Sequence, residues 1–296
     1  MRFLFVDQIL ELNRGEYVRG IKHITPDDAC LGRDEQGRAI FPSSLIGETL
    51  GQLAAWNVMY QNDFHKRPVA GIVSCATVHR PAYLGETLEL ESFIDCLDDS
   101  AVQYHSIAQI NGEKVFEVEG ALGPLVPMPD FIDDDEVRRQ FAEIYRPVSE
   151  EEKVPVVSAA PILNADRTVP CYVFSFDRIL QVEPGVSLLA EKRISRSAPY
   201  FADHFPNNPV LPMTVLLECK LDLARQFLAQ AAFPVNYQFS SMRKIKMNEF
   251  VHPGAQLVCH VAVKKRDEKE CVLTFRSEVN GKRVCVLEML LRVEGV

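Results

Sequence analysis

The 296-residue sequence predicts an α+β protein in which an antiparallel sheet wraps around a long buried helix, and it predicts this unit twice. Three observations carry the prediction. Blocks of the second half repeat blocks of the first half in the same order. Each half holds one long apolar segment, which is typical of a buried helix. Each half then continues with β-rich runs joined by an Asn-Gly pair, a strong hairpin signal.

The composition excludes several classes of protein. Hydrophobic residues make up 47% of the chain and charged residues 25%, which is typical of a globular protein and not of a disordered one. A net charge of −9 argues against a general nucleic-acid binder. No apolar run is long enough for a membrane span, and the start reaches Asp7 too early for a signal-peptide core. We therefore expect a cytoplasmic protein.

The cysteines do not form a metal or disulfide pattern. There are eight, without a CxxC pair and without a His partner at zinc spacing. Several of them, such as Cys259, stand in apolar or alternating contexts. We expect small, buried, reduced thiols and no metal site.

The repeat can be followed along both halves. Phe5-Val6-Asp7-Gln8-Ile9-Leu10 matches Ser175-Phe176-Asp177-Arg178-Ile179-Leu180 at Asp, Ile and Leu, an offset of 170 residues. Pro42 and Glu48 match Pro212 and Glu218 at the same offset. Downstream, the Gly-led strand starts and the Asn111-Gly112 and Asn280-Gly281 pairs match at an offset of 169. Ordered matches of this length indicate a tandem duplication.

The elements of each half are expected in one order. An opening strand comes first, and a helix over 44–60 or 214–230 follows. Strands over 87–96 and 256–263 come next, and the Asn-Gly pairs close hairpins behind them. We expect an N-terminal unit over 1–128 and a C-terminal unit over 169–296. The segment 129–168 between them is expected to be a linker with a short helix over 137–145, which follows the acids Asp133 to Glu136.

One run of the second half carries the chemistry. It reads His204-Phe205-Pro206-Asn207-Asn208-Pro209-Val210-Leu211-Pro212-Met213, and Glu218 follows on the predicted helix. Proline is favoured at the first helical position, so we expect the helix to begin at Pro212. The N–H groups that follow, starting with Met213, then point outward at the positive end of the helix dipole. Such an end can polarise a carbonyl oxygen beside an imidazole that removes a proton.

This run resembles the motif of the 3-hydroxyacyl-acyl-carrier-protein dehydratases of the FabA/FabZ type, in which His-Phe-Pro-x-x-Pro-Val-x-Pro-Gly is followed by an acid on the helix. The spacing from His204 to Glu218 and the opening Asp-x-Ile-Leu strand are similar to the family pattern. The resemblance implies a double hot-dog fold, two tandem hot-dog repeats that form a pseudo-dimer. It also implies that each active site takes its His from one copy and its acid from the other.

Carried over to this sequence, the resemblance implies one complete site. His204 and Glu48 are the expected catalytic residues. Gln52 lies four residues from Glu48 on the same helix face and supports it. The expected substrate-binding residues are Gln52, Met213, Pro212 and Phe205. Where the family has Gly, this chain has Met213, whose side chain is expected to narrow or reroute the acyl tunnel.

The opposite corner of the pseudo-dimer is expected to be incomplete. The first half has Asp34 at the position of His204, so this corner would pair Asp34 with Glu218 and lack an imidazole. The second half in turn has Asp222 where the first has Gln52. We expect a degenerate second site that is inactive or structural.

These residues predict a dehydratase that removes water from 3-hydroxyacyl thioesters, linked to acyl-carrier protein or CoA, to give trans-2-enoyl thioesters in fatty-acid or polyketide-type synthesis. His204 would act as base, Glu48 as acid and the Met213 amide as oxyanion donor. No cofactor or metal is expected beyond the substrate's phosphopantetheine, and a homodimer of the double unit is possible. A basic rim from Arg33, Arg38, Arg193, Arg196, Arg243, Lys244 and Lys246 would suit an acidic carrier protein. A hot-dog acyl thioesterase and a non-catalytic acyl-binding or scaffolding module remain the alternatives.

Overall fold

The computed structural model describes residues 3–34, 36–147 and 173–293. The predicted linker lies outside the described residues over 148–168, as does Cys171. The elements up to residue 147 are β1 (Gln8–Asn13), β2 (Tyr17–His23), β3 (Gly32–Arg33), β4 (Ala39–Phe41), α1 (Ser43–Gln61), β5 (Lys66–Pro68), β6 (Ile72–Val78), β7 (Ala82–Tyr83), β8 (Thr87–Leu97), β9 (Ala101–Ile110), β10 (Glu113–Pro127), the 3-10 turn η1 (Met128–Asp130) and α2 (Asp134–Ile144).

The second half holds one long helix and six strands among its described residues. These elements are β11 (Arg178–Glu183), β12 (Ser187–Arg193), the 3-10 turn η2 (Pro199–Ala202), α3 (Met213–Ala231), β13 (Tyr237–Met247), β14 (Gln256–Arg266), β15 (Glu270–Val279) and β16 (Lys282–Val293). No described helix combines the length and the hydropathy that a membrane crossing requires.

The elements of the two halves correspond one to one along most of the chain. Helices α1 and α3 are both 19 residues long and begin at residues 43 and 213, the offset of 170 that the sequence predicts. Strands β8 and β14 are both 11 residues long and begin at 87 and 256, the predicted offset of 169. The duplication of the sequence is therefore a duplication of structure.

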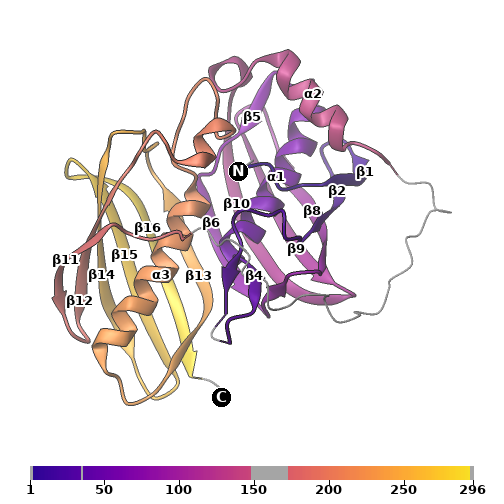
Figure 1. Cartoon of the computed structure of the whole chain (residues 1–296). Coiled ribbons are helices and arrows are strands. Elements are labelled where there is room, and N and C mark those ends of the chain that lie inside the picture. Colours follow the sequence, from indigo (N-terminus) through magenta and orange to yellow (C-terminus); the bar gives the residue numbers. More distant parts are fainter. Residues whose placement is uncertain (1–2, 35, 148–172, 294–296) are drawn as a thin grey trace.

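One antiparallel sheet runs through both halves. Its 13 strands follow the order β1-β2-β8-β9-β10-β6-β13-β16-β15-β14-β12-β11, with β5 added beside β10. The halves meet at β6 and β13, whose backbones pair with Ala76 opposite Met242 and Val73 opposite Ile245. In Figure 1 each half of the sheet curves around its own long helix, α1 in one half and α3 in the other. This is the predicted α+β double hot-dog fold.

The Asn-Gly pairs close hairpins, as predicted. Asn111 and Gly112 have φ angles of 52° and 78°, and Asn280 and Gly281 have 52° and 75°. Two successive positive φ angles define the type I′ turn, which suits the right-handed twist of the flanking strands. The same local chemistry therefore sets the register of β9 with β10 and of β15 with β16.

The long helices are buried on most sides, which explains their apolar sequences. One fully buried residue of α3 is charged. Lys220 has no exposed surface, and its Nζ donates to the Sγ of Cys285 at 3.0 Å. The corresponding residue of α1 is Leu50, which is also fully buried. The C-terminal unit thus carries an amine where the N-terminal unit carries an isobutyl group.

Two details differ from the sequence-based expectation. Pro212 is the N-cap residue of α3 and Met213 is its first helical residue, so the helix begins between the two predicted starts, Pro212 and residue 214. Proline is accepted at this position too, because no intrahelical hydrogen bond needs its missing N–H. The first half also contains a small sheet of β3, β4 and β7. This sheet occupies the position that corresponds to the His204 loop of the second half.

Candidate active site

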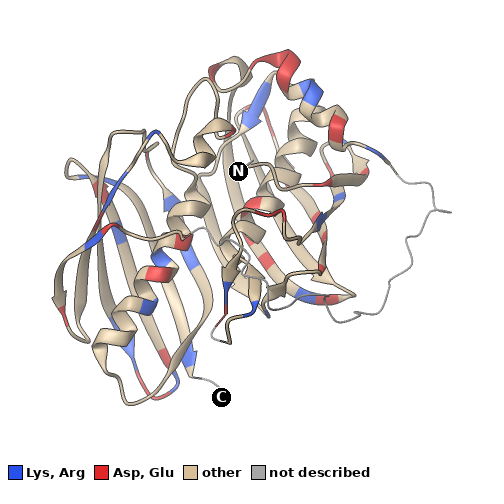
Figure 2. Cartoon of the chain, viewed as in Figure 1, with Lys and Arg blue, Asp and Glu red and all other residues tan. Residues whose placement is uncertain are grey.

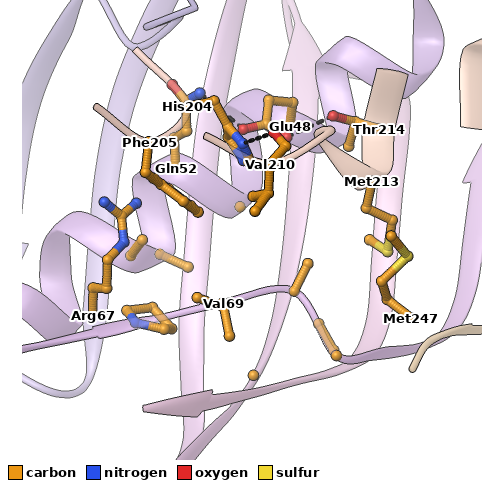
Figure 3. A pocket seen from close by; sticks show the side chains of 18 of the residues that line it. Glu48, Gln52, Arg67, Val69, His204, Phe205, Val210, Met213, Thr214 and Met247 are labelled. Carbon is orange, nitrogen blue, oxygen red and sulfur yellow. Dashed lines mark hydrogen bonds between the residues drawn. The ribbon is translucent and has the colours of Figure 1, made fainter. Parts of the chain in front are cut away.

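A cavity lies where the two halves meet. Its walls come from α1, from the loop before α3 and from the segment that joins β5 to β6. Glu48 of the N-terminal unit and His204 of the C-terminal unit both line it, and Figure 3 shows their side chains next to one another. The fold therefore brings together two residues that are 156 positions apart in the chain.

The loop holds the His204 imidazole in one tautomer. Its Nδ1 lies 3.1 Å from the carbonyl oxygen of Val210. A carbonyl oxygen can only accept, so Nδ1 carries the hydrogen and the neutral ring keeps Nε2 unprotonated. Burial lowers the pKa of His204, while the nearby Glu48 carboxylate acts in the opposite direction. A neutral imidazole with a free Nε2 is the form that can take up a proton.

The Glu48 carboxylate is held from both sides. Its Oε2 accepts a hydrogen bond from the Thr214 hydroxyl at 2.6 Å, and its Oε1 accepts one from Gln52 Nε2 at 2.9 Å (Figure 3). Gln52 is anchored in turn by the backbone of the N-terminal segment. The Phe5 N–H donates to its Oε1 at 2.9 Å, and its Nε2 donates to the Phe3 carbonyl at 3.1 Å.

The predicted substrate-binding residues are divided by the structure. Met213 and Phe205 line the cavity together with Gln52. The ring of Phe205 stacks on the imidazole of His204, with 4.0 Å between ring centroids. Pro212 caps α3 and is not among the residues that line the cavity.

A second, more apolar cavity adjoins the first. The two share Glu48, Tyr104 and Met213 in their walls. The second cavity continues along the junction of the halves, past Ala76 of β6 and Met242 of β13. In Figure 3 the side chains of Met213 and Met247 lie close together at one end of the site. The Met213 side chain therefore lies in the wall of both cavities. A glycine at this position would leave that space free of a side chain.

The opposite corner of the pseudo-dimer has a matching hydrogen bond, from a hydroxyl at the start of one long helix to an acid of the other. The Ser44 hydroxyl, near the N-terminus of α1, donates to Glu218 Oε2 at 2.5 Å. Burial raises the pKa of Glu218, against the effect of the Ser44 hydrogen bond. Asp34 instead accepts a hydrogen bond within the β3–β4 hairpin, where Arg38 Nε donates to its Oδ2 at 2.7 Å. Among the described residues no hydrogen bond or ion pair joins Asp34 to Glu218.

Three residues of the site were not anticipated from the sequence. Thr214 holds Glu48 from the other half of the chain. Tyr104 of β9 lines both cavities, and burial followed by the nearby Glu48 raises its pKa to about 12. Arg67 of β5 brings a cation into the cavity wall. The repeat did hint at Thr214, because Ser44 occupies the matching position of the first half.

The residues of the predicted basic rim are not part of the cavity wall. None of its seven residues lines the cavity, and four of them pair with acids elsewhere: Arg38 with Asp34, Arg193 with Glu191, and Arg243 and Lys244 with Glu288. Figure 2 shows the two signs of charge mixed over both halves. Within the described part of the chain, no group of three or more His, Cys, Asp and Glu side chains is placed to hold a metal ion.

A sheet whose two halves each wrap around a long helix, with a cavity shared by the halves, defines a double hot-dog protein. Solved structures agree at the level of the fold. A MaoC-like dehydratase has a TM-score of 0.56 at 13% identity, covering 95% of this chain and 98% of its own. The 12:0-ACP thioesterase of Umbellularia californica has a TM-score of 0.53 at 13% identity, covering 94% of each chain.

Sequence comparison identifies the family. The family model of the ApeI-like dehydratases matches residues 181–287. The 3-hydroxyacyl-[acyl-carrier-protein] dehydratase FabZ of Shewanella woodyi is 33% identical over 120 residues, which is 38% of this chain and 78% of that protein. The chain belongs to the FabZ-like family of dehydratases.

Proposed function

We propose that this protein eliminates water from 3-hydroxyacyl thioesters, carried by acyl-carrier protein or CoA, to give trans-2-enoyl thioesters. The observation that carries the proposal is the placement of His204 and Glu48 on one cavity, each supplied by a different half. Membership of the dehydratase family supports the reaction class. Fatty-acid or polyketide-type synthesis is the pathway class that consumes such a product, and the substrate's phosphopantetheine is the only cofactor that the reaction requires.

The proposed elimination uses His204 as the base. Its Nε2 takes the proton from C2 of the acyl chain, because Nδ1 is committed to the Val210 carbonyl. The electron pair of the C2–H bond first delocalises onto the thioester oxygen as an enolate, and it then forms the C2–C3 double bond as the C3–O bond breaks. The leaving C3 oxygen takes a proton from Glu48, which must carry this proton when the substrate binds, and becomes water. Proton exchange with solvent then returns both side chains to their starting states.

The thioester oxygen gains charge during this step and needs a donor. Met213 is the first residue of α3, so its N–H has no intrahelical acceptor and lies at the positive end of the helix. We assign this N–H to the developing enolate oxygen. The second cavity, which is lined mostly by apolar side chains, is the proposed channel for the acyl chain.

A direct assay tests the proposal. Incubation with a 3-hydroxyacyl pantetheine thioester should produce the absorbance of the enoyl product. We expect His204→Ala and Glu48→Gln each to reduce turnover by about 100-fold or more, in the range usual for a lost acid or base. Glu218→Gln is the matched control in the opposite corner, and it should leave turnover within about twofold of the unsubstituted protein.

Two other outcomes would replace the proposal with one of its alternatives. Release of free thiol without enoyl product indicates a thioesterase on the same scaffold. Binding of the thioester without any turnover indicates an acyl-binding or scaffolding module. If Glu218→Gln abolishes turnover and Glu48→Gln does not, the assignment of the two corners is reversed.

A further inference from the structure

Arg67 is the one Lys or Arg side chain among the described residues that line the main cavity. It lies on β5, the short strand that joins the sheet beside β10. Figure 3 shows its guanidinium next to Phe205 at one end of the site, with Met213 and Met247 at the other end. The proposed mechanism gives this cation no role.

Among the described residues, the Arg67 guanidinium forms no ion pair. Its Nε is buried and makes no hydrogen bond, and no described acid forms an ion pair with it. The Glu48 oxygens already accept from Thr214 and Gln52. Asp203, the other acid in the cavity wall, accepts the Phe3 N–H at 2.7 Å. Arg67 is half-buried and its Nε is buried, and an arginine in such a position is usually paired, so the missing anion is informative.

The surroundings of Arg67 favour a ligand over a neutral packing role. Burial lowers the pKa of the guanidinium to about 9, and the nearby Glu48 offsets only part of this effect. The Arg67 Cζ lies 3.8 Å from the centroid of Phe205, so one flat face of the guanidinium is covered by a ring. The N–H groups on the edge of the plane stay available, and they form the fork that binds a carboxylate with two hydrogen bonds.

The position of Arg67 limits where that carboxylate can be. Phe205 follows His204 in the sequence and stacks on it, so Arg67 acts close to the reacting carbons. The phosphate of a phosphopantetheine arm is separated from the thioester by the length of the arm. Buried apolar side chains, among them Trp56, Met59 and Val137, line the same cavity. An apolar chain that ends in an acid suits this combination of walls.

We propose that Arg67 is a specificity-determining residue that binds a carboxylate carried by the acyl chain of the substrate. This inference rests on the proposed function, because it places a 3-hydroxyacyl thioester in the cavity. The substrate class that follows is a 3-hydroxyacyl thioester with a second, acidic end.

Binding of inert analogues tests the inference without relying on turnover. We would use two pantetheine thioethers of equal chain length, one ending in a methyl group and one in a carboxylate, and measure Kd by calorimetry. The intact protein should bind the carboxylate analogue about tenfold or more tightly than the methyl analogue. Arg67→Met should remove or reverse this preference, and Arg67→Lys should keep part of it because the charge remains.

Lys66→Met is the matched control on the same strand, since the Lys66 Nζ donates to the Asp99 carbonyl outside the cavity. It should leave the preference unchanged. The methyl analogue must bind to Arg67→Met as well as before, which shows that the His204 loop is intact. Tighter binding of the methyl analogue by the intact protein would overturn the inference, and so would a carboxylate preference that survives in Arg67→Met.

Two further measurements separate related explanations. If phosphopantetheine binds more tightly than pantetheine and Arg67→Met abolishes that difference, Arg67 recognises the carrier arm, which contradicts the inference. Dehydration of a 3-hydroxyacyl thioester with a methyl end tests the proposed function by itself. Turnover of that substrate together with no carboxylate preference leaves the proposed function standing and removes the role of Arg67.

Discussion

The hydroxyl groups at the starts of the two long helices hold the two helix acids across the pseudo-dimer. Thr214 of α3 binds Glu48 of α1, and Ser44 of α1 binds Glu218 of α3. This hydroxyl–carboxyl hydrogen bond is thus present in both corners. Only the Thr214–Glu48 pair shares its cavity with an imidazole, so the two otherwise similar hydrogen bonds should differ in their effect on turnover.

Removing these hydroxyls one at a time tests that difference. Thr214→Val leaves Glu48 without its shorter hydrogen bond, and we expect dehydration to fall by about tenfold, which is about the value of one hydrogen bond. Ser44→Ala should leave kcat within about twofold, because Glu218 is not in the proposed active corner; Ser44 also lines the second cavity, so KM is compared separately. The comparison is of kcat and KM in the enoyl-forming assay. Equal losses in the two variants would contradict a single active corner.

The pH dependence follows from the burial of His204. Burial lowers its pKa below the ordinary value of about 6.5, with the Glu48 carboxylate opposing and Arg67 adding to the decrease. Since the base is the neutral imidazole, activity rises as the pH rises through this pKa. The acid limb of kcat/KM should therefore lie below about pH 6.5. Arg67→Met removes a cation and should move the limb to higher pH. An acid limb above 6.5 in the intact protein would contradict this account.

At the scale of elements, α1 and α3 are copies that now differ in their cores. Leu50 of α1 is a fully buried apolar residue, whereas Lys220 at the matching position of α3 donates to Cys285. A buried amine loses hydration, and a thiol is a weak acceptor that restores little of it. The proposed mechanism does not use Lys220, which is therefore expected to lower the stability of the C-terminal unit.

Replacing Lys220 by the residue of the other copy measures that cost. We expect Lys220→Leu to raise the free energy of unfolding by on the order of 1–2 kcal/mol, because a leucine already fits the same place in α1. Urea unfolding followed by circular dichroism gives the value. Lys269→Leu, on an exposed turn, is the control and should change stability by less than about 0.5 kcal/mol. A clear loss of stability in Lys220→Leu would show that the amine is needed by the core.

For the whole molecule, the repeat in the sequence was enough to predict the architecture. The offset of 170 residues, as between Asp7 and Asp177, which becomes 169 downstream, gave the correspondence of the halves, and the Asn-Gly pairs located the hairpins. His204 and Glu48 could be placed on one site because the family resemblance states which copy supplies which residue. The repeat and the resemblance together therefore predicted the fold and the centre of the candidate site.

The remaining features depend on contacts that no local pattern records. Thr214 meets Glu48 across 166 residues, and Arg67 enters the cavity through a three-residue strand. Asp34 occupies the position of His204 by count, but a hairpin between β3 and β4 has replaced the loop there. The sequence offsets show which residue of one half corresponds to which residue of the other. They do not give the direction of a side chain once the two copies have diverged.

The pairing of β6 with β13 inside one polypeptide has a consequence for enzymology. A site shared by two separate subunits is lost when the subunits part at low concentration. Here the halves are covalently joined, so specific activity should stay constant from micromolar down to low nanomolar protein. A progress-curve dilution series measures this, and a steep fall on dilution would show that a further association is required. Because the halves are joined, each can accept substitutions that an identical partner would have to share. Every chain that supplies His204 also supplies one Glu48.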